Sequence, residues 1–188
     1  MPFRQTKKND PLDERALYDY AVVTLGRRMR TVAELTRLMR NKVERGESGT
    51  AKIDAVIARL NEYGYLNDAD FAAYYAKLRQ ENASLGKRRV RQDLTQKGVH
   101  VEVIAKTLDA AYEDVNEEEL ARRHLERKRV KKPANEKEAA RVMRMLIRAG
   151  FSTSVVFRIL KEWNVDDQAL AALEFMDNDG PASSNGDR

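Results

Sequence analysis

The sequence predicts an all-α protein of three tandem three-helix repeat modules, each helix-turn-helix-like, in an elongated and curved arrangement. Apolar residues recur at i, i+3, i+4 and i+7 in most segments, which is the period of a helix rather than of a strand. Only four prolines and nine glycines interrupt this pattern. A set of residues also recurs after 52 positions, and such an internal repeat indicates copied structural units.

Two helices have clear sequence boundaries. An apolar stripe predicts a helix over residues 51–63, and Gly64 follows where a left-handed C-cap is expected. The stripe consists of Ile53, Val56, Ile57 and Leu60. Thr31 and Glu34 fit a capping box, in which each side chain accepts a hydrogen bond from a backbone N–H that the helix leaves unpaired. A second helix is therefore predicted to begin at about Thr31.

The 52-residue repeat defines the modules. Its first copy contains Arg89, Val90, Leu94, Gly98, Val99, Val103, Ile104 and Leu108. Its second copy contains Arg141, Val142, Leu146, Gly150, Phe151, Val155, Val156 and Leu160. Each copy predicts a helix, a glycine-containing turn and a second helix, and a longer helix precedes both copies. The repeating unit is thus a three-helix module.

The first module is a looser copy, with helices predicted over 13–29, 31–44 and 51–63. We expect modules over residues 12–65, 66–114 and 115–164, a short extra helix over 165–176, and disordered ends over 1–11 and 177–188. Stacked modules contact mainly their neighbours, which yields a long concave surface suited to a large partner. The modules already bury their apolar faces against one another, so we expect a monomer.

Composition narrows the class of protein. The 188 residues carry a formal charge of +5, which is a mild preference for anionic partners. There is no cysteine, which excludes disulfides, thiolate nucleophiles and cysteine-ligated metals. Neither a secretory signal nor a membrane-spanning run is present in the sequence, so we expect a cytoplasmic protein with no membrane contact.

The residues that catalysis needs are scarce. His100 and His124 have no acidic or histidine partner at ligand spacing, which favours structural roles over a metal site. Asp68 and Asp70 stand at the start of a helical pattern, which favours N-capping and helix-dipole roles over acid-base chemistry. We therefore predict no enzyme, no catalytic residue, no metal and no cofactor.

Residues 46–52, GESGTAK, resemble a phosphate-binding loop only faintly. In such a loop the lysine follows glycine and precedes serine or threonine, and a strand leads in. Lys52 has neither neighbour, and a predicted helix precedes the turn. We interpret the segment as a flexible link between helices.

Basic residues give the strongest functional pattern. A helix over 137–149 that buries Val142, Leu146 and Ala149 must place a cationic stripe on its opposite side. The predicted partner- or nucleic-acid-binding residues are that stripe and further basic clusters: Arg28, Arg30, Lys87, Arg88, Arg91, Arg122, Arg123, Arg127, Lys128, Arg129, Lys137, Arg141, Arg144 and Arg148. Such charge neutralises phosphates or steers toward an acidic protein. The alternative interpretation is a solvated helix face.

The glycine turns also invite comparison with a helix-turn-helix that reads DNA. Leu94 and Leu146 stand where close packing across such a turn usually requires a small residue. The helices after the turns, 102–112 and 153–163, lack the cluster of arginine, asparagine and glutamine that reads base edges. We interpret the turn as a way to pack two helices together. A DNA-binding protein remains the alternative function.

Four ordered stretches carry distinctive motifs. Residues 63–72 read YGYLNDADFA, and residues 85–99 read LGKRRVRQDLTQKGV. Upstream of these two stretches the matching residues are Ala21, Leu25, Arg28, Arg30, Thr31, Glu34 and Leu35. Downstream of them, residues 148–151 read RAGF. In this order and spacing they resemble the RecX family, with its G-Y-L-[ND]-D-x-x-F-[AV] and G-x-x-[RK]-[IV]-x-x-[ED]-L-x-x-K-G-[IV] runs. The resemblance covers roughly residues 14–163.

The resemblance implies a regulator that binds RecA filaments, lowers their ATP hydrolysis and strand exchange, and limits their growth in DNA repair. It implies three tandem three-helix modules and no active site. The expected partner is the RecA filament, with weak, sequence-independent binding of single- or double-stranded DNA as a further possibility. The alternative, a helix-turn-helix-like protein that binds DNA without RecA, predicts tight and sequence-selective duplex binding.

Overall fold

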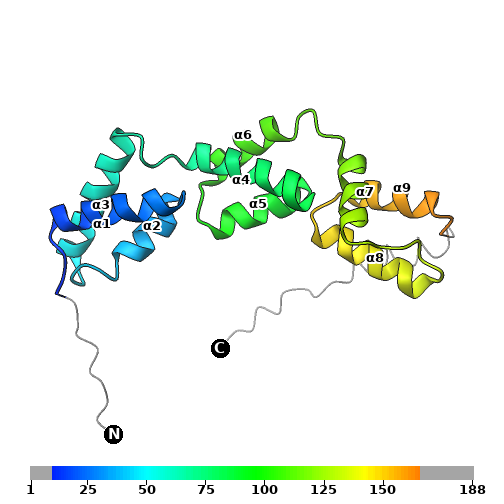
Figure 1. Cartoon of the computed structure of the whole chain (residues 1–188), viewed down its shortest axis with the longest axis horizontal. Helices are drawn as coiled ribbons and strands as arrows, with labels where there is room; N and C mark the ends of the chain where they lie inside the picture. Colours follow the sequence, from blue (N-terminus) through cyan, green and yellow to red (C-terminus); the bar gives the residue numbers. More distant parts are fainter. Residues whose placement is uncertain (1–9, 166–188) are drawn as a thin grey trace, which may run out of the picture. The chain divides into compact units, whose positions relative to one another are not determined.

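The computed structural model describes residues 10–165, and in this range the chain forms nine α-helices and no strand (Figure 1). The helices are α1 (Glu14–Arg27), α2 (Val32–Met39), α3 (Glu47–Glu62), α4 (Asp68–Ala83), α5 (Lys87–Gln96), α6 (Val101–Ala111), α7 (Glu117–Arg127), α8 (Glu136–Arg148) and α9 (Thr153–Glu162). The all-α prediction is confirmed. The predicted helix over 165–176 lies, apart from Val165, outside the described residues, as do residues 1–9 and the tail over 177–188.

The helices belong to two compact units. The first unit runs up to Tyr75 and also includes Arg91–Ala110. The second unit consists of Ala76–Val90 and the residues from Ala111 onward. The division passes through α4 and α5, so each unit holds part of the middle three helices together with one flanking set.

Each unit has its own apolar core. In the first unit the core is built on α1 and α3, which pack together, with α2 closing it. Its buried residues are Leu17, Ala21, Leu35, Met39, Ile53, Val56, Leu60 and Leu66. In the second unit α7 and α8 both pack against α9. Its largest fully buried side chains are Leu120, Leu146, Phe151, Ile159 and Leu160.

The predicted repeat is visible in the backbone. Gly98 and Gly150 both adopt the left-handed conformation, with φ of 78° and 92°. After each glycine the chain reverses in the same way: the Val99 N–H donates to the Leu94 carbonyl at 3.1 Å, and Phe151 donates to Leu146 at 3.2 Å. Positive φ is strained for any residue with a Cβ, which explains glycine at both turns.

Helix α3 begins at Glu47, earlier than predicted. The prediction of a flexible link over residues 46–52 is therefore wrong. The carboxylate of Glu44 accepts hydrogen bonds from the Ser48 hydroxyl and the Lys52 ammonium, both at 2.7 Å, and so ties the start of α3 to the preceding loop. A Cβ on Gly49 would collide with the Glu44 carbonyl oxygen. The glycine therefore permits close packing of the helix start on the preceding loop. Helix α2 is shorter than expected, ending at Met39.

The capping box at Thr31 is half correct. The Thr31 hydroxyl accepts a hydrogen bond from the Glu34 N–H at 3.0 Å, as predicted. The Glu34 carboxylate does not return the bond; it pairs with the Lys97 ammonium at 2.8 Å. The partner lies 63 residues away in sequence, so no local motif could have revealed it.

Candidate interaction surface

A stripe of four cationic side chains runs along the outer face of α8. Val142, Leu146 and Ala149 are buried, as predicted, and the opposite face is exposed at every stripe position. The stripe residues are Lys137, Arg141, Arg144 and Arg148. At about 1.5 Å rise per residue, their eleven-residue span corresponds to roughly 16 Å. None of the four forms a hydrogen bond or ion pair within the described part of the chain.

Helix α8 is held firmly at its start. The Asn135 side chain accepts a hydrogen bond from the Glu138 N–H at 3.0 Å, and Glu138 accepts one from the Ala134 N–H at 2.9 Å. This reciprocal cap fixes where the helix begins, and its buried face fixes its rotation. The cationic stripe is consequently a preorganised surface.

Unlike the α8 stripe, Arg122 of α7 and Arg158 of α9 form ion pairs within the second unit. Arg122 pairs with both Glu162 and Glu118, and Arg158 pairs with Glu118 at 2.9 Å. The hydrogen bonds that Arg122 donates to Glu162 and Glu118 raise the pKa of Arg122. The bonds that Glu118 accepts from Arg122 and Arg158 lower the pKa of Glu118. Arg122 was predicted to contact a partner, but its charge is already balanced within the unit.

Arg127 also forms hydrogen bonds within the second unit. Its guanidinium donates to the backbone carbonyls of Glu81 and Asn82, and His124 Nδ1 lies 3.0 Å from the Ala83 carbonyl. These contacts satisfy carbonyls at the end of α4, where a helix leaves its last acceptors unpaired. The neighbouring basic residues of the predicted cluster are exposed, namely Arg123, Lys128 and Arg129.

The start of α5 brings further basic charge beside α8. The Gly86 N–H donates to the Ala149 carbonyl at 2.9 Å, which places the first turn of α5 against the end of α8. Lys87 is half-buried, Arg88 is exposed, and the first turn contains no acidic residue. Cations are unfavourable near a helix N-terminus because they meet the positive end of the dipole. The two basic side chains therefore do not gain stability from the dipole of α5.

Three predicted site residues lie in the first unit. Arg91 and Arg28 are exposed, whereas Arg30 is half-buried. The Nε of Arg30 is buried and has no acceptor among the residues described. These three residues belong to a different compact unit from the α8 stripe.

The structure assigns fold roles to the remaining polar candidates. The His100 carbonyl accepts the Ile104 N–H at 3.0 Å at the start of α6, and His124 is buried edge-on to Phe151. The predicted N-capping by Asp68 and Asp70 is wrong for α4, because Asn67 accepts from the N–H groups of residues 69 and 70. Asp68 instead accepts the Val32 N–H at 2.9 Å at the start of α2. Burial raises the pKa of Asp68.

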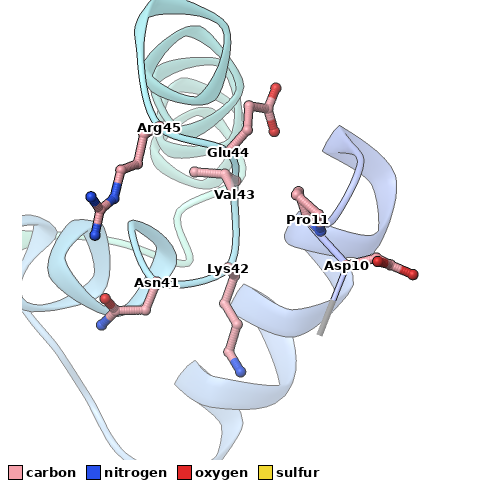
Figure 2. Close-up of a pocket in the computed structure, with 7 residues that line it drawn as sticks. All are labelled: Asp10, Pro11, Asn41, Lys42, Val43, Glu44 and Arg45. Atoms are coloured by element: carbon pink, nitrogen blue, oxygen red, sulfur yellow. The ribbon is translucent and has the colours of Figure 1, made fainter. Parts of the chain in front are cut away.

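A surface hollow of about 560 Å³ lies between the loop before α3 and the residues that lead into α1 (Figure 2). Its lining mixes charges of both signs: Asp10, Pro11, Asn41, Lys42, Val43, Glu44 and Arg45. The bond from Lys52 lowers the pKa of Glu44 to about 2, so its carboxylate is a fixed anion at the start of α3. A fixed anion beside the start of α3 disfavours the binding of a phosphate there.

The helices that follow the glycine turns offer little for base reading. On α6 the exposed first turn carries Val101 and Glu102, and a carboxylate there repels phosphate. On α9 the exposed Arg158 is paired with Glu118. Within residues 10–165 no cluster of His, Asp and Glu could hold a metal ion, and no helix could cross a membrane.

Two glycine turns of the same design join helices of an all-helical protein, and one of those helices, α8, carries an exposed cationic face. Family models named "RecX, second three-helix domain" and "RecX, third three-helix domain" match residues 67–108 and 116–160. A protein named Regulatory protein RecX from Thermobifida fusca is 33% identical over 73% of each chain. The chain belongs to the RecX family, as its motifs predicted.

Other comparisons agree with this assignment. The Regulatory protein RecX of Mycolicibacterium vanbaalenii is 36% identical, and the match spans 56% of this chain and 61% of that protein, which is less than two thirds of its length. The crystal structure of RecX from Lactobacillus salivarius has a TM-score of 0.65 at 19% identity. That match covers 80% of this chain and 96% of the other. At this identity the likeness supports the fold alone.

Proposed function

We propose that this protein binds the RecA filament and inhibits its ATP hydrolysis, strand exchange and growth. Membership of a family of named regulatory proteins supports a regulator. We propose that it acts without an active site, a metal or a cofactor, as a cytoplasmic monomer. The observation that carries the mode of binding is the α8 stripe, four exposed cations without partners in the described residues.

The stripe suits a polyanionic partner. The protein balances Arg122 and Arg158 internally but leaves the α8 cations facing solvent. A RecA filament on single-stranded DNA offers both phosphates and acidic protein surface. Exposed cations of this kind accelerate encounter and orient the complex, and their contribution falls as salt screens them.

The remaining predicted residues extend the same surface or support it. We propose direct contact for Lys87 and Arg88 beside the α8 stripe, and for the exposed Arg123, Lys128 and Arg129. We propose that Arg28, Arg30 and Arg91 of the first unit make separate contacts. Arg122 and Arg127 act indirectly, because they hold α7 against its neighbours. DNA binding is proposed to be weak and independent of sequence.

The experiment measures ATP hydrolysis by the cognate RecA on single-stranded DNA with substoichiometric protein. Wild type should depress hydrolysis. The double variant Arg144→Ala/Arg148→Ala should weaken inhibition roughly fivefold at low salt, because each of the two cations contributes about 0.5 kcal/mol. The difference should shrink at higher salt, where screening removes the same contribution from wild type.

The matched control is Arg15→Ala with Arg45→Ala, which removes two exposed arginines from the first unit. It should inhibit as wild type does. Unchanged hydrolysis across a wide titration of the wild-type protein would refute RecA regulation. Full inhibition by the α8 double variant at low salt would instead show that the stripe is a solvated face.

A further inference from the structure

Two exposed tyrosines flank the turn that ends α3. Gly64 has φ of 71°, and three backbone bonds close the helix end: Tyr63 N to Arg59 O at 3.1 Å, Gly64 N to Asn61 O at 3.0 Å, and Tyr65 N to Leu60 O at 2.9 Å. The next residue, Leu66, is buried in the core of the first unit. The backbone of both tyrosines is therefore rigid.

The end of α9 repeats this motif in the second unit. Asn164 has φ of 56°, and the bonds run from Trp163 N to Ile159 O, from Asn164 N to Lys161 O, and from Val165 N to Leu160 O. Their lengths are 3.2, 2.9 and 3.2 Å. Trp163 and Val165 occupy the places of Tyr63 and Tyr65.

The side chains at the two helix ends have different environments. Trp163 and Val165 are partly buried and pack against the core of the second unit. Tyr63 and Tyr65 are 58% and 55% exposed. The fold thus explains the apolar residues after α9 but not the rings after α3. Large exposed aromatics on a rigid backbone are characteristic of binding anchors, because little conformational freedom is lost when they bind.

A cation also fixes the Tyr63 ring. The Arg59 guanidinium lies 4.5 Å from the centroid of Tyr18 and 5.7 Å from that of Tyr63. Arg59 thereby joins two rings into one surface on α1 and α3. Tyrosine and arginine are the residue types most enriched at the energetic centres of protein interfaces.

Charge around the tyrosines identifies the class of partner. Residues 53–76 contain one basic residue, Arg59, and four acidic residues, Asp54, Glu62, Asp68 and Asp70. Nucleic acid binding requires clustered lysine or arginine to neutralise phosphates. An aromatic surface with acidic surroundings therefore fits a protein partner rather than a nucleic acid.

We propose that Tyr63, Tyr65 and Arg59 form a protein-docking surface, here called the tyrosine anchor, that contacts RecA protomers in the filament. The proposal rests on the proposed function for the identity of its partner. It adds a second contact of different chemistry, because the α8 stripe acts through charge and the tyrosine anchor through buried aromatic area.

The test compares the double variant Tyr63→Ala/Tyr65→Ala with wild type. The measurement is binding to the RecA filament on single-stranded DNA. Affinity should fall at least about tenfold, and the loss should persist at high salt because it comes from apolar area rather than from charge. Binding to naked single-stranded DNA should remain within twofold. Circular dichroism and the melting temperature should be nearly unchanged, because both rings are exposed.

The control is Val23→Ala, whose side chain on α1 is also 58% exposed. Position 23 is about 140° around the helix from Tyr18, so it lies on another face. Val23→Ala should bind normally. Filament binding by the tyrosine double variant within twofold of wild type would overturn the anchor alone, as would an equal loss of naked-DNA binding. Absence of filament binding by wild type would overturn the proposed function and the anchor together.

Discussion

Each compact unit contains a junction between a glycine turn and the start of another helix. In both junctions the carbonyl just before the glycine accepts a hydrogen bond, but the donor groups differ. In the first unit the Lys97 carbonyl, just before Gly98, accepts the Thr31 hydroxyl at 2.7 Å. In the second unit the Ala149 carbonyl, just before Gly150, accepts the Gly86 N–H at 2.9 Å. Both donors immediately precede a helix, α2 or α5. The feature that the two junctions share is therefore the carbonyl that the end of the helix leaves without a helical partner, whichever group donates to it.

The surroundings of the two junctions differ more. In the first unit, Lys97 pairs with Glu34 and lies over the rings of Phe71 and Tyr75 at 5.7 and 5.5 Å. In the second unit, a Cβ on either Gly86 or Gly150 would collide with the other segment's backbone. The first junction thus depends on side-chain charge and the second on backbone proximity. They should respond differently to glycine substitution, salt and pH.

Substitution of the turn glycines should give the largest effect. Gly150→Ala should destabilise the second unit by about 3 kcal/mol or more, because it combines positive φ with a clash against the backbone of Arg89. Gly98→Ala should cost less, since its new Cβ would come within 3.0 Å of one atom, the Cβ of Ala33, whereas a Cβ at position 150 would come that close to three. Urea unfolding monitored by the fluorescence of Trp163, the single tryptophan, measures the second unit; hydrogen exchange measures the first.

The control for both is Gly26→Ala, because a Cβ at position 26 meets nothing within 4 Å and the residue lies in α1. It should be neutral or stabilise by up to about 1 kcal/mol through helix propensity. A smaller loss for Gly150→Ala than for Gly98→Ala would contradict the view that the second junction depends on backbone proximity.

Removing the Lys97 charge should affect only the first junction. Lys97→Met keeps an unbranched apolar side chain near Phe71 and Tyr75 but breaks the ion pair with Glu34. The side chain of Lys97 is 30% exposed and that of Glu34 is 17% exposed. We expect a loss of about 1 kcal/mol, smaller than for a fully buried pair. A double-mutant cycle with Glu34→Gln, repeated at low and high salt, isolates the coupling. Coupling that does not decline with salt would count against an electrostatic junction.

Asp68 should give the smallest effect, with a defined pH dependence. Burial raises its pKa above the usual 3.8, so the folded chain binds more protons than the unfolded chain between 3.8 and the raised value. Stability contributed by this group is therefore highest at low pH and declines as pH rises through that interval. Asp68→Asn, which keeps an oxygen for the Val32 N–H, should stabilise the first unit slightly at pH 7. Unfolding titrations at pH 3 and pH 7 test this, since the advantage should vanish at the lower pH.

Much of the fold could be predicted from local patterns. The helical period identified the buried face of α8, and the recurrence of Gly98 and Gly150 identified the turns. The start of α3 was missed because GESGTAK contains two glycines and a serine, residues typical of turns. Only the contact of Gly49 with the Glu44 backbone shows that the glycine serves packing.

The candidate site was predicted less completely. The sequence placed Arg122, Arg127 and Arg144 in the same class of exposed cation. The structure separates them, because the first pairs with Glu162 and the second donates to the carbonyls of Glu81 and Asn82. The tyrosine anchor was missed altogether, although Tyr63 and Tyr65 stand within a motif that the sequence made prominent. Nothing in the local pattern distinguishes an exposed ring from one that packs on a core.

The sequence by itself determined the helices, the glycine turns and the solvent-facing position of the α8 stripe. These follow from relations within about four residues, namely the helical repeat and the conformational freedom of glycine. Only the tertiary structure decided which charges remain free and which aromatics remain exposed. Those properties depend on groups such as Glu34 and Lys97, which are far apart along the chain and meet only when the helices pack.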